Sequence, residues 1–60
     1  MKCSEMLRLL RKAGWEQVSQ RGSHIKLVHC EIEEIIIFPN HGSSELGKGL
    51  EKKIRKIAKL

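Results

Sequence analysis

Residues 15–29 have the sequence WEQVSQRGSHIKLVH, and this stretch decides the fold. Its side chains follow a period of two along residues 15–20 and again along residues 23–29, and that period is typical of β-strands. Arg21 and Gly22 separate the two runs. We therefore expect two antiparallel strands joined by a tight turn that contains glycine.

The second of these strands has two different faces. Ile25 and Leu27 share one face, and His24 and Lys26 share the other, because successive side chains of a strand point in opposite directions. If the aliphatic pair faces the core, His24 faces solvent.

A third strand is predicted at residues 35–38, a β-branched and aromatic run that ends at Pro39. We expect residues 31–34 to form the turn before it, because three glutamates in four residues do not suit an interior strand. The composition of residues 40–44 is typical of a loop.

Helical periodicity is present on both sides of the strands. Residues 4–13 are predicted to form an amphipathic helix with Ser4 as its N-cap and Gly14 as its stop. A second helix is predicted from residue 46 onward, with Ser44 as a possible cap. Its apolar positions follow the helical spacing of four, four and three residues from Leu46, and they are Leu46, Leu50, Ile54, Ile57, Ala58 and Leu60.

The predicted order of elements is therefore α-β-β-β-α. Each helix has one apolar stripe and the sheet has one face to cover, so we expect an α+β two-layer sandwich with a three-stranded antiparallel sheet and both helices on one face. The 60 residues are enough for a single domain, 1–60. A domain of this size buries only about 60% of its unfolded surface, so a partner would add stability.

The net charge of +5 is concentrated at one end of the chain. Residues 1–45 carry six Lys or Arg and six Glu, whereas residues 46–60 carry six Lys or Arg and only Glu51. Such an excess indicates a polyanion or an acidic protein surface as partner, although solvated lysines on a helix would give the same pattern. The cations opposite the apolar stripe are Lys48, Lys52, Arg55, Lys56 and Lys59, with Lys53 at its margin.

The chain is expected to work in the cytoplasm. Cys3 and Cys30 form no CxxC pair, and we expect both to stay reduced as small apolar side chains. No apolar segment with a cleavage site follows Met1, and the longest apolar run is far shorter than a membrane span.

Arg21, Gly22, Ser23 and His24 form the segment most suited to chemistry. The turn lifts a histidine to the start of a strand, and Lys26 follows two residues later. Imidazole exchanges protons near neutral pH, and the flanking cations would hold a phosphate beside it. RNA supplies its own nucleophile, the 2′-hydroxyl, so a base and charge stabilisation can suffice for cleavage without a metal.

The chain resembles the HicA family, the ribonuclease toxins of HicA/HicB toxin–antitoxin pairs. The resemblance covers nearly the whole chain. The matching segments are residues 2–10, Gly14-Trp15, Arg21-Gly22-Ser23-His24, Phe38-Pro39-Asn40-His41 and the Leu-Gly-Lys-Gly-Leu sequence at 46–50.

This resemblance implies a fold similar to the double-stranded RNA-binding domain, cleavage of messenger RNA without a metal or other cofactor, and neutralisation by a HicB antitoxin. His24 corresponds to the family's catalytic histidine, and Ile25 stands where members often have a second one. His41 falls in a proline-x-histidine loop, where we expect it to cap the loop. The residues expected to bind RNA or stabilise phosphate are Arg21, Gly22, Ser23, Lys26, Lys48, Lys52, Arg55 and Lys56.

Two other functions fit the same sequence: a nucleic-acid-binding module without catalysis, and an interaction protein whose basic helix docks an acidic partner. A metal site of His29, Cys30 and His41 is disfavoured, because their spacing matches no zinc signature and a fourth ligand is missing. Trp15 is expected to pack in the core rather than to stack on bases.

Overall fold

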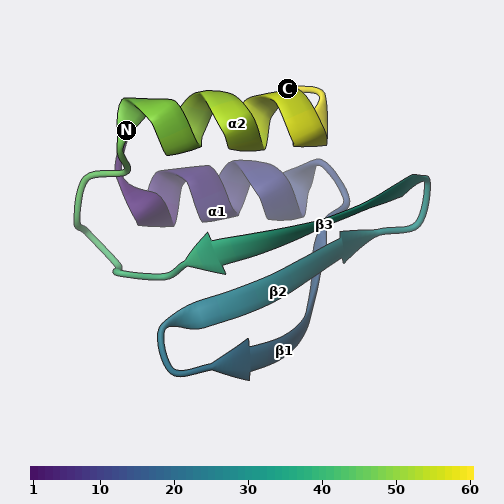
Figure 1. The fold of residues 1–60 in the computed structure, drawn as a ribbon, viewed down its shortest axis with the longest axis horizontal. Helices are drawn as coiled ribbons and strands as arrows, with labels where there is room; N and C mark the ends of the chain where they lie inside the picture. The colour runs from purple at the N-terminus through teal and green to yellow at the C-terminus, as the bar shows by residue number, and fades with distance from the viewer.

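The computed structural model of the chain describes residues 1–60, with two helices and three strands in the predicted order. The elements are α1 (Cys3–Lys12), β1 (Glu16–Arg21), β2 (His24–His29), β3 (Ile32–Pro39) and α2 (Lys48–Ala58). The two helices run side by side over one face of the sheet and leave the other face open (Figure 1). The predicted two-layer α+β sandwich is therefore confirmed. Neither helix combines the length and the apolar character needed to cross a bilayer.

The sheet has the strand order β1-β2-β3, and both pairings are antiparallel. The predicted hairpin is present, with its turn at Gly22 and Ser23, one residue later than expected. Gly22 has a φ of +60°, a conformation that the first position of a tight two-residue hairpin turn favours and that glycine adopts at little cost. This glycine lets Arg21 and His24 face each other directly across the ladder.

The two faces of β2 are as predicted. Ile25 and Leu27 are fully buried and lie beside Phe38 and Ile36 of β3, whereas His24 is exposed. Trp15 is also buried, as expected. The full core consists of Cys3, Met6, Leu10, Trp15, Ile25, Leu27, Ile36, Phe38, Leu46, Ile54 and Ala58.

The prediction of a turn at residues 31–34 is wrong. The turn consists of Cys30 and Glu31, and β3 already begins at Ile32. β3 is an edge strand with one neighbour. Glu33 and Glu34 can therefore be part of the strand and still reach solvent, which they could not do in an interior strand. Cys30 is exposed in this turn, and the prediction of a small apolar side chain holds only for Cys3.

Ser4 is not the cap of α1. The helix begins at Cys3, and the carbonyls of the 40–47 loop accept the hydrogen bonds of its first turn: Cys3 N donates to Ser44 O at 3.0 Å, and Ser4 N donates to Gly42 O at 2.9 Å. The carbonyl groups of a distant loop thus pair with the free N–H groups of the first helical turn, a role that was expected of the Ser4 side chain. Gly14 follows the helix end with a φ of +103°, as expected of a helix stop.

The second helix starts two residues later than predicted. Leu46 donates its N–H to Met1 O at 2.8 Å, so it belongs to an extended connection beside the N-terminal segment, and α2 begins at Lys48. The Met1 amino group donates to the Glu45 carboxylate at 3.1 Å, and this hydrogen bond raises the pKa of the amino group above 8.0. These contacts hold the 40–47 loop against α1.

Candidate active site

His24 is the first residue of β2, at the end of the sheet where the hairpin turns. Arg21 is its partner on β1 and Pro39 its partner on β3. The imidazole is exposed and makes no hydrogen bond within the protein. Both ring nitrogens are therefore open to a substrate.

The turn before His24 is held by hydrogen bonds to its carbonyl groups. Gln20 Nε2 donates to Gly22 O at 2.9 Å, and Asn40 N donates to Ser23 O at 2.6 Å. The N–H groups of Gly22 and Ser23 have no partner in the protein. A fixed turn with two free amide N–H groups can donate hydrogen bonds to a phosphate oxygen.

The surroundings of His24 are positively charged. Arg21 lies opposite it, and Lys26 lies two residues further along the same face of β2, partly buried. No Asp or Glu occurs between Glu16 and Glu31. The structure thus brings together the predicted residues of the hairpin, namely Arg21, Gly22, Ser23, His24 and Lys26.

The predicted cations of α2 fall into two groups. Lys48, Lys52 and Lys56 are exposed along one side of the helix. Arg55 instead donates to the Glu51 carboxylate at 3.3 Å and lies beside the Met1 sulfur at 4.0 Å. Its charge is already paired, and that pairing was not foreseen from the sequence.

The hairpin turn, the 40–47 loop and the first turn of α2 all lie at the same end of the molecule (Figure 1). Lys48 begins the helix at this end, whereas Lys56 lies eight residues further on, about 12 Å along the axis. Lys48 and Lys52 are therefore the helix cations nearest to the end that carries His24.

His41 does not cap its loop through its side chain. The imidazole is exposed and unpaired, and only the backbone of His41 takes part in the turn, through its N–H to Pro39 O and its carbonyl to Ser44 N, both at 3.2 Å. His41 therefore helps to close this loop through its backbone, and its side chain takes no part.

His29 has a structural role that the sequence did not indicate. Its Nε2 lies 2.9 Å from Ala13 O, which can only accept a hydrogen bond, and its Nδ1 lies 3.0 Å from Glu31 N, which can only donate one. The ring therefore joins the end of α1 to the β2–β3 turn as a neutral imidazole protonated on Nε2. A Cβ at Gly14 would lie 2.8 Å from this nitrogen, so the glycine also makes room for the ring.

No three His, Cys, Asp or Glu side chains gather in a way that could hold a metal ion. His29 uses both ring nitrogens within the protein, so neither is free to bind a metal ion.

The fold and this site define the class of the protein: a small, basic α+β domain that presents one free histidine among cations and open amide groups. These features suit a polyanionic ligand.

The chain belongs to the family of HicA toxins of bacterial toxin–antitoxin systems, whose family model matches residues 3–60. A probable mRNA interferase HicA of Pseudomonas fluorescens (strain Pf0-1) is 41% identical over 56 residues, which cover 93% of this chain and 90% of that protein. The resemblance stated from the sequence is confirmed.

A solved structure supports the same assignment. The chain is similar to a chain of a HicA3 and HicB3 toxin-antitoxin complex, with a TM-score of 0.74 and 30% sequence identity. The match covers 100% of this chain and 96% of the other. The fold and the family therefore agree over the full length of the domain.

Proposed function

We propose that this toxin is an endoribonuclease that cleaves messenger RNA in the cytoplasm, with His24 as its general acid or base. The single observation that carries the proposal is the free imidazole of His24, which faces Arg21 across a fixed turn. The 41%-identical relative has the same activity in its name, mRNA interferase.

The reaction needs few protein groups, because RNA carries its own nucleophile. The 2′-oxygen attacks the phosphorus and the bond to the 5′-oxygen breaks. His24 either removes the 2′-hydroxyl proton while water protonates the leaving 5′-oxygen, or protonates that oxygen while water takes the 2′-hydroxyl proton. The products of this step are a 2′,3′-cyclic phosphate and a 5′-hydroxyl. Arg21, Lys26 and the free amides of Gly22 and Ser23 stabilise the negative charge that builds up on the phosphorane.

We also propose that an antitoxin of the HicB type is the protein partner. The support is the similar fold of the toxin chain in the HicA3 and HicB3 complex. A partner is also reasonable physically, because a 60-residue domain has little core.

The RNA chain is proposed to run from His24 toward Lys48 and Lys52. These lysines lie on the part of α2 nearest to the hairpin end, and their backbone-directed contacts would bind RNA of any sequence. Arg55 contributes less, because Glu51 neutralises it.

Replacing both Lys48 and Lys52 by glutamine is expected to weaken RNA binding and to make the binding less dependent on salt concentration. Loss of two phosphate contacts should reduce the slope of log K against log[salt] by about 1.4 for single-stranded RNA. Fluorescence anisotropy at several salt concentrations, with His24→Ala in the background to prevent cleavage, measures this slope.

The matched control is the Lys56→Gln, Lys59→Gln double variant, which removes the same charge from the far end of α2. Its slope should stay close to that of the parent. Equal slopes for the two double variants would contradict the proposed path of the RNA.

Incubation of the purified protein with RNA in excess EDTA tests the function itself. We expect fragments, because the proposed step uses the 2′-hydroxyl, an imidazole and fixed positive charge. Retarded but intact RNA on a gel would instead indicate a binding module without catalysis.

A further inference from the structure

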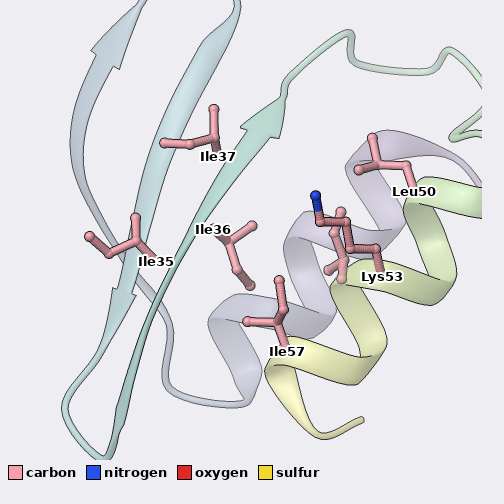
Figure 2. Close-up of a pocket in the computed structure, with 7 residues that line it drawn as sticks. Ile35, Ile36, Ile37, Leu50, Lys53 and Ile57 are labelled. Atoms are coloured by element: carbon pink, nitrogen blue, oxygen red, sulfur yellow. The ribbon is translucent and has the colours of Figure 1, made fainter.

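A shallow groove runs between β3 and α2, on the side of the molecule away from β1. Figure 2 shows Ile36 pointing from β3 toward the helix, with Leu50, Lys53 and Ile57 of α2 on the other side of the groove. Its volume is about 160 Å³, below the range of about 300 to 1,000 Å³ that is typical of small-molecule pockets. The groove therefore suits a protein segment better than a small ligand.

The floor of the groove is the free edge of β3. This strand pairs only with β2, and apart from the Pro39 carbonyl, which accepts from His41 N, its outer backbone groups have no partner in the chain. β3 is also the longest strand, with eight residues, and its Ile35 and Ile37 side chains are 47% and 56% exposed. The apolar part of this edge, from Ile35 to Phe38, favours pairing with another strand, whereas the exposed Glu33 and Glu34 precede it.

The opposite edge of the sheet lacks these properties. β1 has six residues, all exposed, and Val18 is its one aliphatic side chain. A register shift between Gln17 and Ser19 also interrupts its ladder with β2. Bulges and polar side chains protect edges from pairing, so β1 is protected along its length. The ladder of β3 with β2 also shifts, between Leu27 and His29, and Glu33 and Glu34 are exposed there, so the open part of β3 is its apolar part from Ile35 to Phe38.

An extended segment that pairs with β3 would present alternate side chains to two apolar surfaces. Side chains on the helix side would enter the groove and contact Leu50 and Ile57, and those on the other side would lie beside Ile35 and Ile37 on the open face of the sheet (Figure 2). Both surfaces would then be covered at the same time.

The positive charge around the groove favours an acidic partner. The lysine side chain of Lys53 reaches over the groove, and Lys52 and Lys56 flank it on α2. The chain has a net charge of +5, so a second copy would bring two lysine-rich helices together. An acidic segment would instead place carboxylates against these ammonium groups, provided that it pairs with Ile35 to Phe38 and leaves Glu33 and Glu34 uncovered.

We propose that this groove binds an extended, acidic and β-branched segment of a partner protein, which adds a fourth strand to the sheet at β3. This proposal rests on the proposed function in one respect: the partner that supplies the segment is taken to be the antitoxin. It assigns the docking surface to the side of the sheet away from β1, distinct from the hairpin turn that carries His24.

A titration with a designed peptide tests the proposal. The probe is an eight-residue peptide with blocked ends in which valine alternates with glutamate, and the control has lysine in place of every glutamate. The amide signals of the toxin, followed by two-dimensional NMR, are expected to shift at residues 35–38 and 50–57 with the acidic peptide. The lysine peptide is expected to bind about five- to tenfold more weakly.

The Lys53→Glu variant provides the matched comparison. Its side chain is exposed, so the variant should fold, and it should bind the acidic peptide more weakly and so reduce the difference between the two peptides, because Lys52 and Lys56 remain. Cleavage of RNA should stay within about twofold of the parent, since small surface changes away from the site have small effects. Peptide binding and RNA cleavage can therefore fail separately.

Three outcomes would overturn the proposal. The first is a set of shifted signals at β1 or at the hairpin turn in place of β3 and α2. The second is a shift of the β3 signals when protein concentration alone is raised, which would indicate a second copy as the occupant. The third is a shift of the same residues by an RNA oligonucleotide but not by the acidic peptide.

Discussion

Replacing His24 with alanine is expected to reduce the rate of RNA cleavage by a factor of about 10² to 10⁴, the usual contribution of a positioned general acid or base. The loss should appear in the single-turnover rate rather than in RNA binding, because Arg21, Lys26 and the lysines of α2 remain. A gel assay with enzyme in excess over labelled RNA measures the single-turnover rate.

The stability of the same variant should be nearly unchanged. His24 is exposed and makes no hydrogen bond, so the free energy of unfolding should change by less than about 0.5 kcal/mol. His24→Gln, which keeps a polar side chain but cannot exchange a proton near neutral pH, should be as inactive as the alanine variant. A stable His24→Ala protein that cleaves RNA at the parent rate would remove His24 from the mechanism.

Replacing Phe38 with alanine is expected to unfold most of the protein. Phe38 is fully buried and pairs with Ile25, at the centre of the single core. Truncation of a buried phenylalanine costs about 3 to 5 kcal/mol, and a core in a domain of this size rarely supplies more than about 3 to 5 kcal/mol of stability. Urea unfolding followed by circular dichroism measures the loss.

The control for this variant is the neighbouring Ile37→Ala. Ile37 is 56% exposed on the opposite face of β3, so its truncation should cost no more than about 1 kcal/mol. The contrast depends only on the alternation of faces along β3. Similar unfolding midpoints for the two variants would contradict the assigned faces.

The sequence was sufficient to predict the central hairpin, because local rules govern it. A period of two, a glycine at the turn and the aliphatic pair Ile25 and Leu27 together determine which side of β2 is buried. The exposure of His24 follows from that assignment alone, so the face that presents the candidate catalytic residue could be predicted without coordinates.

The errors lie where distant segments meet. Ser4 has the chemistry of a helix cap, but carbonyl groups about forty residues away satisfy the first turn of α1. Glu33 and Glu34 fit a strand only because β3 is an edge, and no pattern local to residues 31–34 distinguishes an edge from the middle of a sheet. Such features depend on the assembled fold.

The candidate site shows the same division. The charges of Lys48, Lys52, Arg55 and Lys56 are visible in the sequence, but the pairing of Arg55 with Glu51 near Met1 appears only in three dimensions. The role of His29 was also missed, since its partners come from residues 13 and 31.

The measurement that tests the account most directly uses an RNA with one 2′-deoxy nucleotide at a mapped cleavage site. The proposed mechanism draws its nucleophile from the 2′-hydroxyl, so cleavage should stop at the modified position and continue at unmodified ones, where the upstream fragment should end in a 2′,3′-cyclic phosphate. Undiminished cleavage after the deoxy nucleotide would show that the attacking oxygen comes from elsewhere, and it would contradict the mechanism built on His24.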